Sequence, residues 1–369
     1  MGHIVLYEAG HLPHDKRNHP LYSNGGEFKN AGVNPGSPTK ILPGLLLINI
    51  GNFLQKDFVA GTLSKTKKET MMKKFLKWLG ILIGGLLVLV VLAVVTLGLL
   101  GGARLNRTMD IQPEALTIPT DAGSIQRGEH LVDVACKSCH GQDLSGQVLL
   151  NDPAIGKVYS ANLTAGQGGI EGNYTDQDLV RSIRHGVARD GRKLVVMPSE
   201  VFNNFSAEDL GAIIAYLRTL PPVDHQVPKP QFTFMARILL SAGMVGNIIP
   251  AEIIDHQKVF PNMPAVGANL AYGEYLSHFC ASCHGAELAG GQPPEPNAPP
   301  APNLTPGGEL AGWSESDFLQ SIRTGVTPSG HQLNSEFMPW ESFAKFSDDE
   351  LKGLWMYLQN LPSLPTATN

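Results

Sequence analysis

The sequence predicts an all-α protein in which an N-terminal transmembrane helix precedes two tandem helical domains of one kind. Three observations lead to this prediction. One long stretch is apolar and uncharged, the chain after it contains an internal repeat, and the repeated segments have helical hydrophobic spacing with little strand signal. The formal net charge of −5 argues against a nucleic-acid binder.

The apolar stretch runs from Trp78 to Ala103 and holds 26 residues without a charged side chain. About 20 apolar residues suffice for a helix to cross a bilayer, whereas the core of a signal peptide has about 7–15. Arg104 and Arg107 follow the stretch closely, and six lysines precede it: Lys65, Lys67, Lys68, Lys73, Lys74 and Lys77. The positive-inside rule then predicts a cytoplasmic N-terminus and an extracytoplasmic C-terminal part. The alternative is a cleaved signal peptide, for which "GLLGGA" would be a poor cleavage site.

Residues 1–70 contain many Gly, Pro and Asn residues and no sustained hydrophobic period. Met71 and Met72 open a sequence typical of the start of a secreted or anchored protein. We therefore expect residues 1–70 to be a disordered tail or a mis-assigned N-terminal extension, and residues 71–104 to be the anchor.

The repeat begins with "GEHLVDVACKSCHGQDLSG" (128–146), which returns as "GEYLSHFCASCHGAELAG" (273–290). From the Asn of a following "NLT" to the Met of an "MP" pair is 35 residues in both copies, and from that Met to a Tyr in the last helix is 19 in both. The repeat predicts two domains of about a hundred residues. These are residues 105–222 and 268–369, joined by an apolar linker at 223–267.

Each domain is predicted to be helical. Capping boxes are expected at Thr175-x-x-Asp178 and Ser314-x-x-Asp317, and Ser206 and Ser347 are expected to open the last helix of each copy. The loops are rich in Gly and Pro, so each domain has a thin core of its own. A large apolar ligand would complete it.

The four cysteines all fall in two C-x-x-C-H motifs, Cys136, Cys139 and His140 in one copy and Cys280, Cys283 and His284 in the other. C-x-x-C-H is the attachment signature of haem c. Two thiols three positions apart can add to the vinyl groups on one porphyrin edge, and the adjacent His then points at the iron. A zinc site would need a second Cys pair or two spaced His per domain, a redox dithiol would need a βαβ context, and a plain disulfide would not need the His. We predict two covalently attached haem c groups, with both histidines as iron ligands.

The second iron ligand is expected at a position that recurs in both copies. Met197 and Met338 do recur, 57 and 54 residues after the His, and a Met/His pair is the ligation of cytochromes c. Other candidates do not recur, since His130, His185 and Lys193 are matched by Tyr275, Thr324 and His331. We expect these at the surface or the haem rim, and His225 and His256, between the domains, to be structural.

The residue before each "NL" pair is Ala161 or Pro302. Its carbonyl is expected to accept the other imidazole N–H of the ligating His. Arg184 and Arg323 recur in the two copies. They would either pair with haem propionates or be solvated helix residues, and the sequence leaves both readings open.

The motifs "CxxCHG … NLT … SIRxG … MP … FSxxxL … YL…LP" resemble class I c-type cytochrome domains over residues 124–222 and 268–363. The closest resemblance is to the cytochrome c subunits of periplasmic dehydrogenases, a group of membrane-anchored multihaem cytochromes. The resemblance implies an all-α cytochrome c fold, covalent haem and one-electron transfer. The first copy departs from the family at "ANLTAG", where "PNLTP" is more usual.

Together these observations predict a single-pass membrane protein whose two haem domains lie on the periplasmic side. It would relay electrons between a dehydrogenase or quinol-oxidising complex and a soluble cytochrome or oxidase. The alternatives are a dihaem enzyme of the peroxidase or thiosulfate-oxidising type with one exchangeable haem ligand, and a haem-based sensor. Residues 265–369 carry a net charge of −8, which could steer a basic partner. The apolar part of the linker, 232–254, is expected to be buried between the haem domains rather than to lie in the membrane interface.

Overall fold

The structure is a computed structural model that describes residues 50–246, 248–293 and 298–367, with side chains described from residue 65 on. The chain divides between Lys77 and Trp78 into two units. The contacts discussed below all belong to the second unit, residues 78–369.

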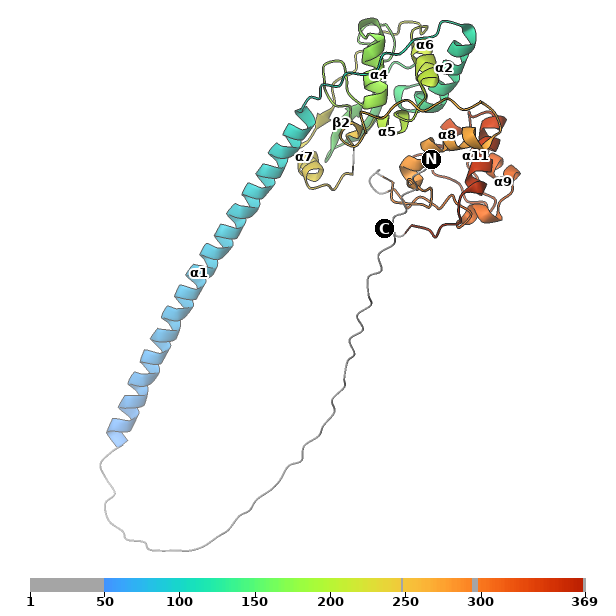
Figure 1. The fold of residues 1–369 in the computed structure, drawn as a ribbon. Coiled ribbons are helices and arrows are strands. Elements are labelled where there is room, and N and C mark those ends of the chain that lie inside the picture. Colours follow the sequence, from blue (N-terminus) through green and yellow to red (C-terminus); the bar gives the residue numbers. More distant parts are fainter. Residues whose placement is uncertain (1–49, 247, 294–297, 368–369) are drawn as a thin grey trace, which may run out of the picture. The chain divides into compact units, whose positions relative to one another are not determined.

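The first element is α1 (Ile50–Asn106), a helix of 57 residues (Figure 1). Its part from Lys65 to Asn106 is long and apolar enough to cross a membrane, and its most apolar window is fully exposed within the chain. The helix begins before residue 71, the start predicted for the anchor. Residues 1–49, which make up most of the predicted tail or extension, lie outside the described residues.

The two copies of the repeat have corresponding helices in the same order, except that α2 and α3 of the first copy correspond to the single helix α8 of the second. The first copy and the linker contain α2 (Ala122–Ala135), α3 (Lys137–His140), β1 (Val148–Asp152), β2 (Gly156–Tyr159), η1 (Glu171–Asn173), α4 (Asp176–His185), α5 (Ser199–Phe202), α6 (Ala207–Leu217), β3 (Gln231–Phe232), α7 (Phe234–Ser241) and η2 (Pro250–Glu252). The second copy contains α8 (Leu270–His284), η3 (Glu309–Gly312), α9 (Glu315–Thr324), α10 (Trp340–Phe343) and α11 (Asp348–Asn360). The protein is mostly helical, which confirms the predicted fold class.

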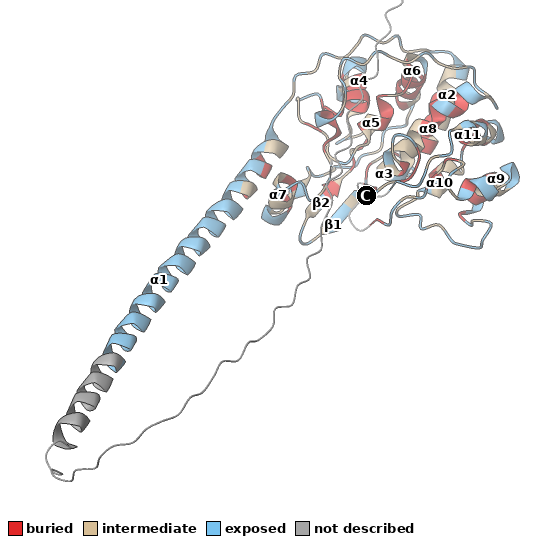
Figure 2. Cartoon of the chain, turned by 60° about the horizontal axis from the view of Figure 1, so that its bottom comes forward, coloured by how far each residue is buried: buried red, intermediate tan, exposed pale blue. Residues whose placement is uncertain are grey.

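The core of each copy forms where its first and last helices cross. α2 packs on α6, and α8 packs on α11. A glycine permits each crossing, because a Cβ at Gly128 would lie 1.9 Å from the Ala212 carbonyl oxygen, and one at Gly273 would lie 1.9 Å from that of Gly353. Figure 2 shows buried residues on the helices of both copies, α4 and α5 included, while the described part of α1 is almost wholly exposed.

The helix starts follow the predicted caps. Thr175 with Asp178 and Ser314 with Asp317 form complete capping boxes. Ser347 also forms a complete box with Glu350, whereas Ser206 accepts only the backbone N–H of Asp209. The Asp209 carboxylate is instead engaged by Arg127.

A small antiparallel sheet in the first copy was not expected from the sequence. β2 pairs with β1 and with β3, which lies in the linker. Most side chains of these strands are exposed or half-buried, so no regular apolar alternation marks them.

The prediction that the apolar linker is buried between the haem domains is wrong for α7. This helix packs against the end of α1, where the Ser241 hydroxyl donates to the Leu97 carbonyl over 2.8 Å. Phe234 and Met235 are about half exposed, at 47% and 52%. The linker segment at Ile249–Ala251 is buried, and its η2 helix packs against α5 of the first copy.

Candidate haem sites

The C-x-x-C-H segments lie at equivalent places in the two copies. In the first, Cys136 is the N-cap of the short α3, Cys139 lies within that helix and His140 ends it. In the second, Cys280, Cys283 and His284 form the last turn of α8. All four cysteines lie in the described part of the chain, and no disulfide joins any two of them. Burial raises the pKa of Cys136 and of Cys280 to about 12, which favours the protonated thiol.

Each histidine is held by the carbonyl that the sequence predicted. His140 Nδ1 lies 2.8 Å from the Ala161 oxygen, and His284 Nδ1 lies 2.8 Å from the Pro302 oxygen. Because a carbonyl only accepts, Nδ1 carries the proton and Nε2 keeps a free lone pair. Burial lowers the pKa of both imidazoles, and the bond to the carbonyl offsets only part of this effect. Both histidines are therefore neutral and oriented as metal ligands.

The "NLT" triplet explains how the carbonyl reaches the histidine. The Asn162 side chain accepts both the N–H and the hydroxyl of Thr164, at 2.9 and 2.8 Å, and donates to the Val223 carbonyl at 2.8 Å. Asn303 and Thr305 repeat these bonds, with Leu364 as the carbonyl partner. The buried Asn thus ties the loop before it to the chain that follows the last helix.

A tight turn after each C-x-x-C-H segment completes this arrangement. Leu144 and Leu288 adopt left-handed φ values of 59° and 57° and are buried. Their carbonyls accept the N–H groups of Leu163 and Leu304, each at 2.8 Å, and so align each "NL" strand beside the histidine. A left-handed leucine is uncommon, and its recurrence in both copies indicates that the turn is required there.

A cavity of about 270 Å³ opens beside the first C-x-x-C-H segment. Cys136, Cys139 and His140 line it together with Met197. Most of the remaining lining is apolar, including Leu149, Tyr174, Ile183, Phe202, Phe205, Ile213 and Val227. The thiols, the oriented imidazole and the thioether therefore face one apolar space, which fits a covalently held haem.

The two methionines occupy equivalent turns. The Met197 carbonyl accepts the Ser199 N–H at 2.8 Å, and the Met338 carbonyl accepts the Trp340 N–H at 2.7 Å. Both side chains pack against the core of their copy. Val196, just before Met197, has a φ of 70°, and its N–H donates to the Ile248 carbonyl at 2.8 Å. The linker thus holds this strained residue beside the cavity.

The linker and the small sheet supply cavity residues that sequence reasoning missed. Leu149 and Tyr159 come from the sheet, and Val227, Pro228 and Pro230 come from the linker. The repeat could not reveal them because the second copy has no matching strands among the described residues. The proline-rich run after Leu220 was the one feature of the sequence that could have indicated that the linker contributes to the cavity.

The histidines that do not recur have structural partners. His185 is buried, contrary to the surface or rim position expected, and lies 3.1 Å from both His256 and Glu114. His130 contacts Glu350 of the second copy at 2.7 Å. His225 Nδ1 contacts the Ser145 carbonyl at 2.8 Å, as expected for a structural residue.

Lys193 and His331 occupy equivalent positions of the repeat, and they also differ in burial. Lys193 is buried and pairs with Glu252, contrary to the expected position, whereas His331 is exposed.

The two recurring arginines brace equivalent turns. Arg184 is fully buried, donates to the Asn203 carbonyl at 2.8 Å and stacks over the Phe260 ring at 4.0 Å. Arg323 donates to the equivalent Ala344 carbonyl and pairs with Asp348 at 2.8 Å. Arg184 is therefore not a solvated helix residue, and each guanidinium ties the middle helix to the turn after α5 or α10.

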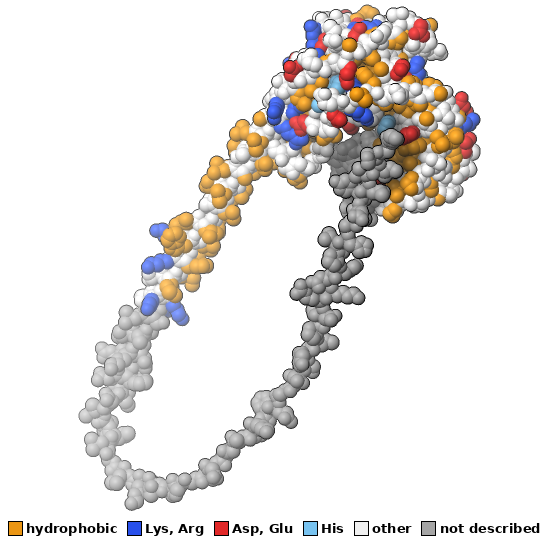
Figure 3. Space-filling model, viewed as in Figure 1, with side chains coloured by type: hydrophobic (Ala, Val, Ile, Leu, Met, Phe, Trp, Pro, Cys, Tyr) orange, Lys and Arg blue, Asp and Glu red, His pale blue; other side chains and the backbone are white. Residues whose placement is uncertain are grey.

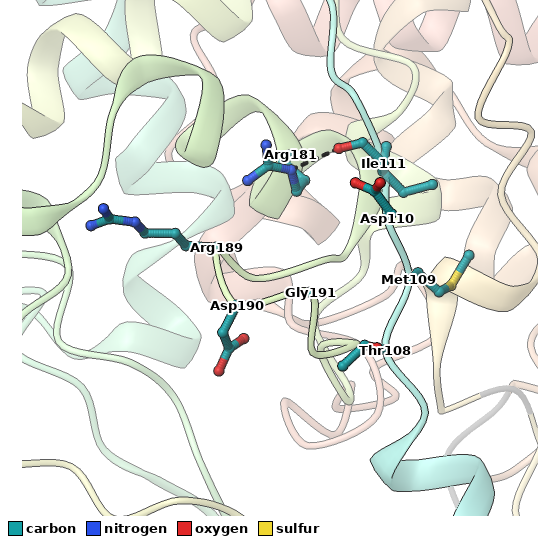
Figure 4. Close-up of a pocket in the computed structure, with 8 residues that line it drawn as sticks. All are labelled: Thr108, Met109, Asp110, Ile111, Arg181, Arg189, Asp190 and Gly191. Carbon is teal, nitrogen blue, oxygen red and sulfur yellow. Dashed lines mark hydrogen bonds between the residues drawn. The ribbon is translucent and has the colours of Figure 1, made fainter.

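A second cavity, of about 310 Å³, lies elsewhere in the first copy (Figure 4). Its lining is polar and contains none of the predicted haem residues. Arg181 donates through Nε to the Ile111 carbonyl at 2.8 Å and pairs with Asp178 at 2.7 Å. These contacts attach the segment that follows α1 to α4.

Comparison with known proteins identifies a cytochrome c domain in each copy of the repeat. Residues 123–217 match the family described as cytochrome c oxidase, cbb3-type, subunit III, and residues 270–362 match the family described as cytochrome c. The fructose dehydrogenase cytochrome subunit of Gluconobacter japonicus is 31% identical over 275 residues, which are 67% of this chain and 55% of that protein.

Other relatives carry similar names. The cytochrome c subunit of the quinone alcohol dehydrogenase of Gluconacetobacter polyoxogenes is 25% identical over 296 residues, which cover 72% of this chain and 60% of that protein. The gluconate 2-dehydrogenase cytochrome c subunit of Pantoea cypripedii is 26% identical over 263 residues, 64% of this chain and 59% of that protein. The chain thus spans less than two thirds of the length of these relatives. It carries two tandem cytochrome c domains and is a distant homologue of the cytochrome c subunits of dehydrogenases.

Proposed function

We propose that the chain is a single-pass, membrane-anchored electron carrier with two covalent haem c groups. The observation that carries this proposal is the gathering of Cys136, Cys139, His140 and Met197 around one apolar cavity. The second copy repeats the cysteines, the carbonyl-bound histidine and the methionine turn.

The residues would divide the work as follows. Cys136, Cys139, Cys280 and Cys283 would form the thioether bonds that hold the two haem groups. His140 and Met197 would bind one iron, and His284 and Met338 would bind the other. Haem iron supplies one-electron chemistry by cycling between Fe(II) and Fe(III). The apolar lining lowers the local dielectric and excludes water, and the thioether ligand favours the reduced iron.

The anchor would place both haem domains on the periplasmic face of the cell membrane. Figure 3 shows hydrophobic side chains along the described part of α1, with basic side chains, which are lysines in the sequence, gathered at the N-terminal end of that part. This charge bias supports a cytoplasmic N-terminus. A reporter that is active only in the periplasm, fused after Asn369, would be active under this topology.

The partner on the donor side would be a dehydrogenase. The relatives are cytochrome subunits of a fructose, an alcohol and a gluconate dehydrogenase, and electrons would pass from such an enzyme, or from a quinol-oxidising complex, to a soluble cytochrome or an oxidase.

Ligand-deletion variants of the haem-loaded full chain test the carrier function. Ferric haem with a Met ligand has a weak long-wavelength charge-transfer band, and Met197→Leu and Met338→Leu should each remove about half of it. Met356→Leu is the matched control, because Met356 is an exposed residue of α11. If the unmodified protein has only half the band and one of its haems binds carbon monoxide, the dihaem-enzyme alternative replaces the carrier.

A further inference from the structure

The contact between α7 and α1 is close and specific. A Cβ at Gly98 would lie 2.1 Å from the Phe234 ring, and a Cβ at Gly101 would lie 2.0 Å from the Arg237 carbonyl oxygen. The Ser241 hydroxyl adds its bond to the Leu97 carbonyl. Two small residues thus let α7 lie directly against the last turns of the apolar helix.

The position of this contact along α1 determines the level at which α7 would lie relative to the bilayer. At a rise of about 1.5 Å per residue, Leu97 and Gly101 lie roughly 28 and 35 Å along the helix from Trp78. The hydrocarbon core of a bilayer is about 30 Å thick. If the uncharged stretch spans a bilayer from Trp78, α7 lies at the outer boundary between acyl chains and headgroups.

Along α1, charged side chains begin one turn beyond this contact. Arg104 pairs with Glu252 at 2.6 Å and donates to the Leu240 carbonyl, and Lys193 pairs with the same Glu252. The polar domain therefore starts just outside the level of α7.

The exposed residues of α7 and of the turn after it include three large apolar side chains. Ala236 and Leu240 are buried, whereas Phe234, Met235 and Met244 are 47%, 52% and 72% exposed. Arg237, also exposed, could reach anionic headgroups. Large apolar side chains exposed together mark an interaction surface, and the nearest surface of that chemistry is the lipid around α1.

We propose that α7 and the turn at residues 242–246 lie in the outer interface of the phospholipid bilayer, with Phe234, Met235 and Met244 inserted among the lipids. The proposal rests on the proposed membrane anchor. The first copy would then be attached to the membrane at two points. The helix α1 would set its distance from the membrane, and α7 would set its rotation about α1.

Site-specific fluorescence in vesicles tests this. The four native cysteines are assigned to haem, so a single added cysteine can carry an environment-sensitive dye in the full, haem-loaded chain. The test variants are Met235→Cys and Met244→Cys. Leu89→Cys, midway along the apolar stretch, is the in-membrane control, and Met356→Cys, exposed on α11, is the aqueous control.

Quenching of the fluorescence by spin-labelled lipids gives the depth of each dye in the bilayer. The fluorescence is divided by that of the same variant in vesicles without spin label, so that quenching by haem cancels. We expect dyes at 235 and 244 to be quenched by shallow labels, at about 5–10 Å below the headgroup boundary. The Leu89→Cys dye should be quenched by deep labels, and the Met356→Cys dye by neither.

Two results would overturn the proposal while leaving the anchor intact. Dyes at 235 and 244 that respond to aqueous iodide as the Met356→Cys dye does would place α7 in water. Dyes reached by neither iodide nor spin-labelled lipid would mean that a protein surface covers α7. An unquenched dye at Leu89→Cys would remove the anchor itself, and this inference with it.

Discussion

Arg127 of α2 and Glu350 of α11 form an ion pair at 2.9 Å across the two haem domains. His130 adds a second contact to Glu350 at 2.7 Å, and the Tyr272 hydroxyl donates to it at 3.0 Å. On the other side, the hydroxyl of Tyr275 donates to Asp209 at 2.8 Å. Both carboxylates are almost fully buried, so the junction depends on their charges being compensated.

The first prediction concerns acid. Burial raises the pKa of Glu350, but the bonds from His130, the Ser347 backbone and Arg127 outweigh it and lower the pKa from 4.5 to about 2. A carboxyl with a depressed pKa in the folded state stabilises that state above its unfolded pKa. This contribution should be complete above pH 4.5 and be lost as the pH falls toward about 2.

Thermal unfolding of the haem-loaded protein as a function of pH measures this contribution. Glu350→Gln should destabilise the protein at neutral pH and flatten the pH dependence below 4.5, whereas exposed Glu336→Gln should change neither. An unchanged acid slope in Glu350→Gln would contradict the assignment.

The second prediction compares the two equivalent arginines. Removing the buried Arg184 leaves two carbonyls unpaired and empties the space over Phe260. Arg184→Ala should therefore cost about 3 kcal/mol of unfolding free energy. Arg323→Ala should cost about 1 kcal/mol, because this side chain is 33% exposed. Chemical denaturation measures the unfolding free energy of both variants. Equal losses would contradict the prediction that the buried arginine contributes more to stability than the partly exposed one.

The third prediction concerns the crossing of α8 and α11. A methyl group at Gly273 would collide with the Gly353 carbonyl, whereas no atom of the described residues lies within 4 Å of a Cβ at Gly312. Gly273→Ala should destabilise the second copy by about 3 kcal/mol, and Gly312→Ala should change its stability by less than about 1 kcal/mol. Holoprotein yield and denaturation midpoint are the measurements. If the two variants behaved alike, the helices would have room to separate.

The fourth prediction concerns an electron acceptor. Residues 265–369 carry a net charge of −8 against −3 for residues 104–264. A basic soluble cytochrome should be reduced faster at low ionic strength, with the rate falling steeply as salt is added. Stopped-flow reduction with a basic and an acidic cytochrome as a matched pair tests this. A rate that does not depend on salt would exclude steering by the acidic domain.

The local chemistry of the sites could be predicted from sequence because short motifs determine it. The C-x-x-C-H segments, the capping boxes at Thr175 and Ser314, and the carbonyl partners Ala161 and Pro302 each depend on residues close in sequence or on the repeat. The assignment of Met197 and Met338 as iron ligands stays a prediction, supported in the first copy by the shared cavity.

The features that the sequence did not reveal involve long-range contacts. His185 has a polar side chain in an amphipathic helix, and only its contacts with Glu114 and His256, each 71 residues away, explain its burial. α7 has the composition of a buried segment, and its place beside α1 depends on a contact across 144 residues. Pairing of β2 with β3 likewise joins distant segments.

The contacts between the two cytochrome c domains follow a two-fold pattern. His130 and Tyr275 are equivalent positions of the repeat, as are Asp209 and Glu350, and each member of the first pair contacts the acid of the opposite copy. α10 packs on α2 just as α5 packs on α8. Such an exchange between equivalent positions is the signature of a two-fold homodimer. The protein is thus built like a homodimer whose two halves are joined by residues 223–267, so that the second half docks on the first within one chain and at a rate that does not depend on protein concentration.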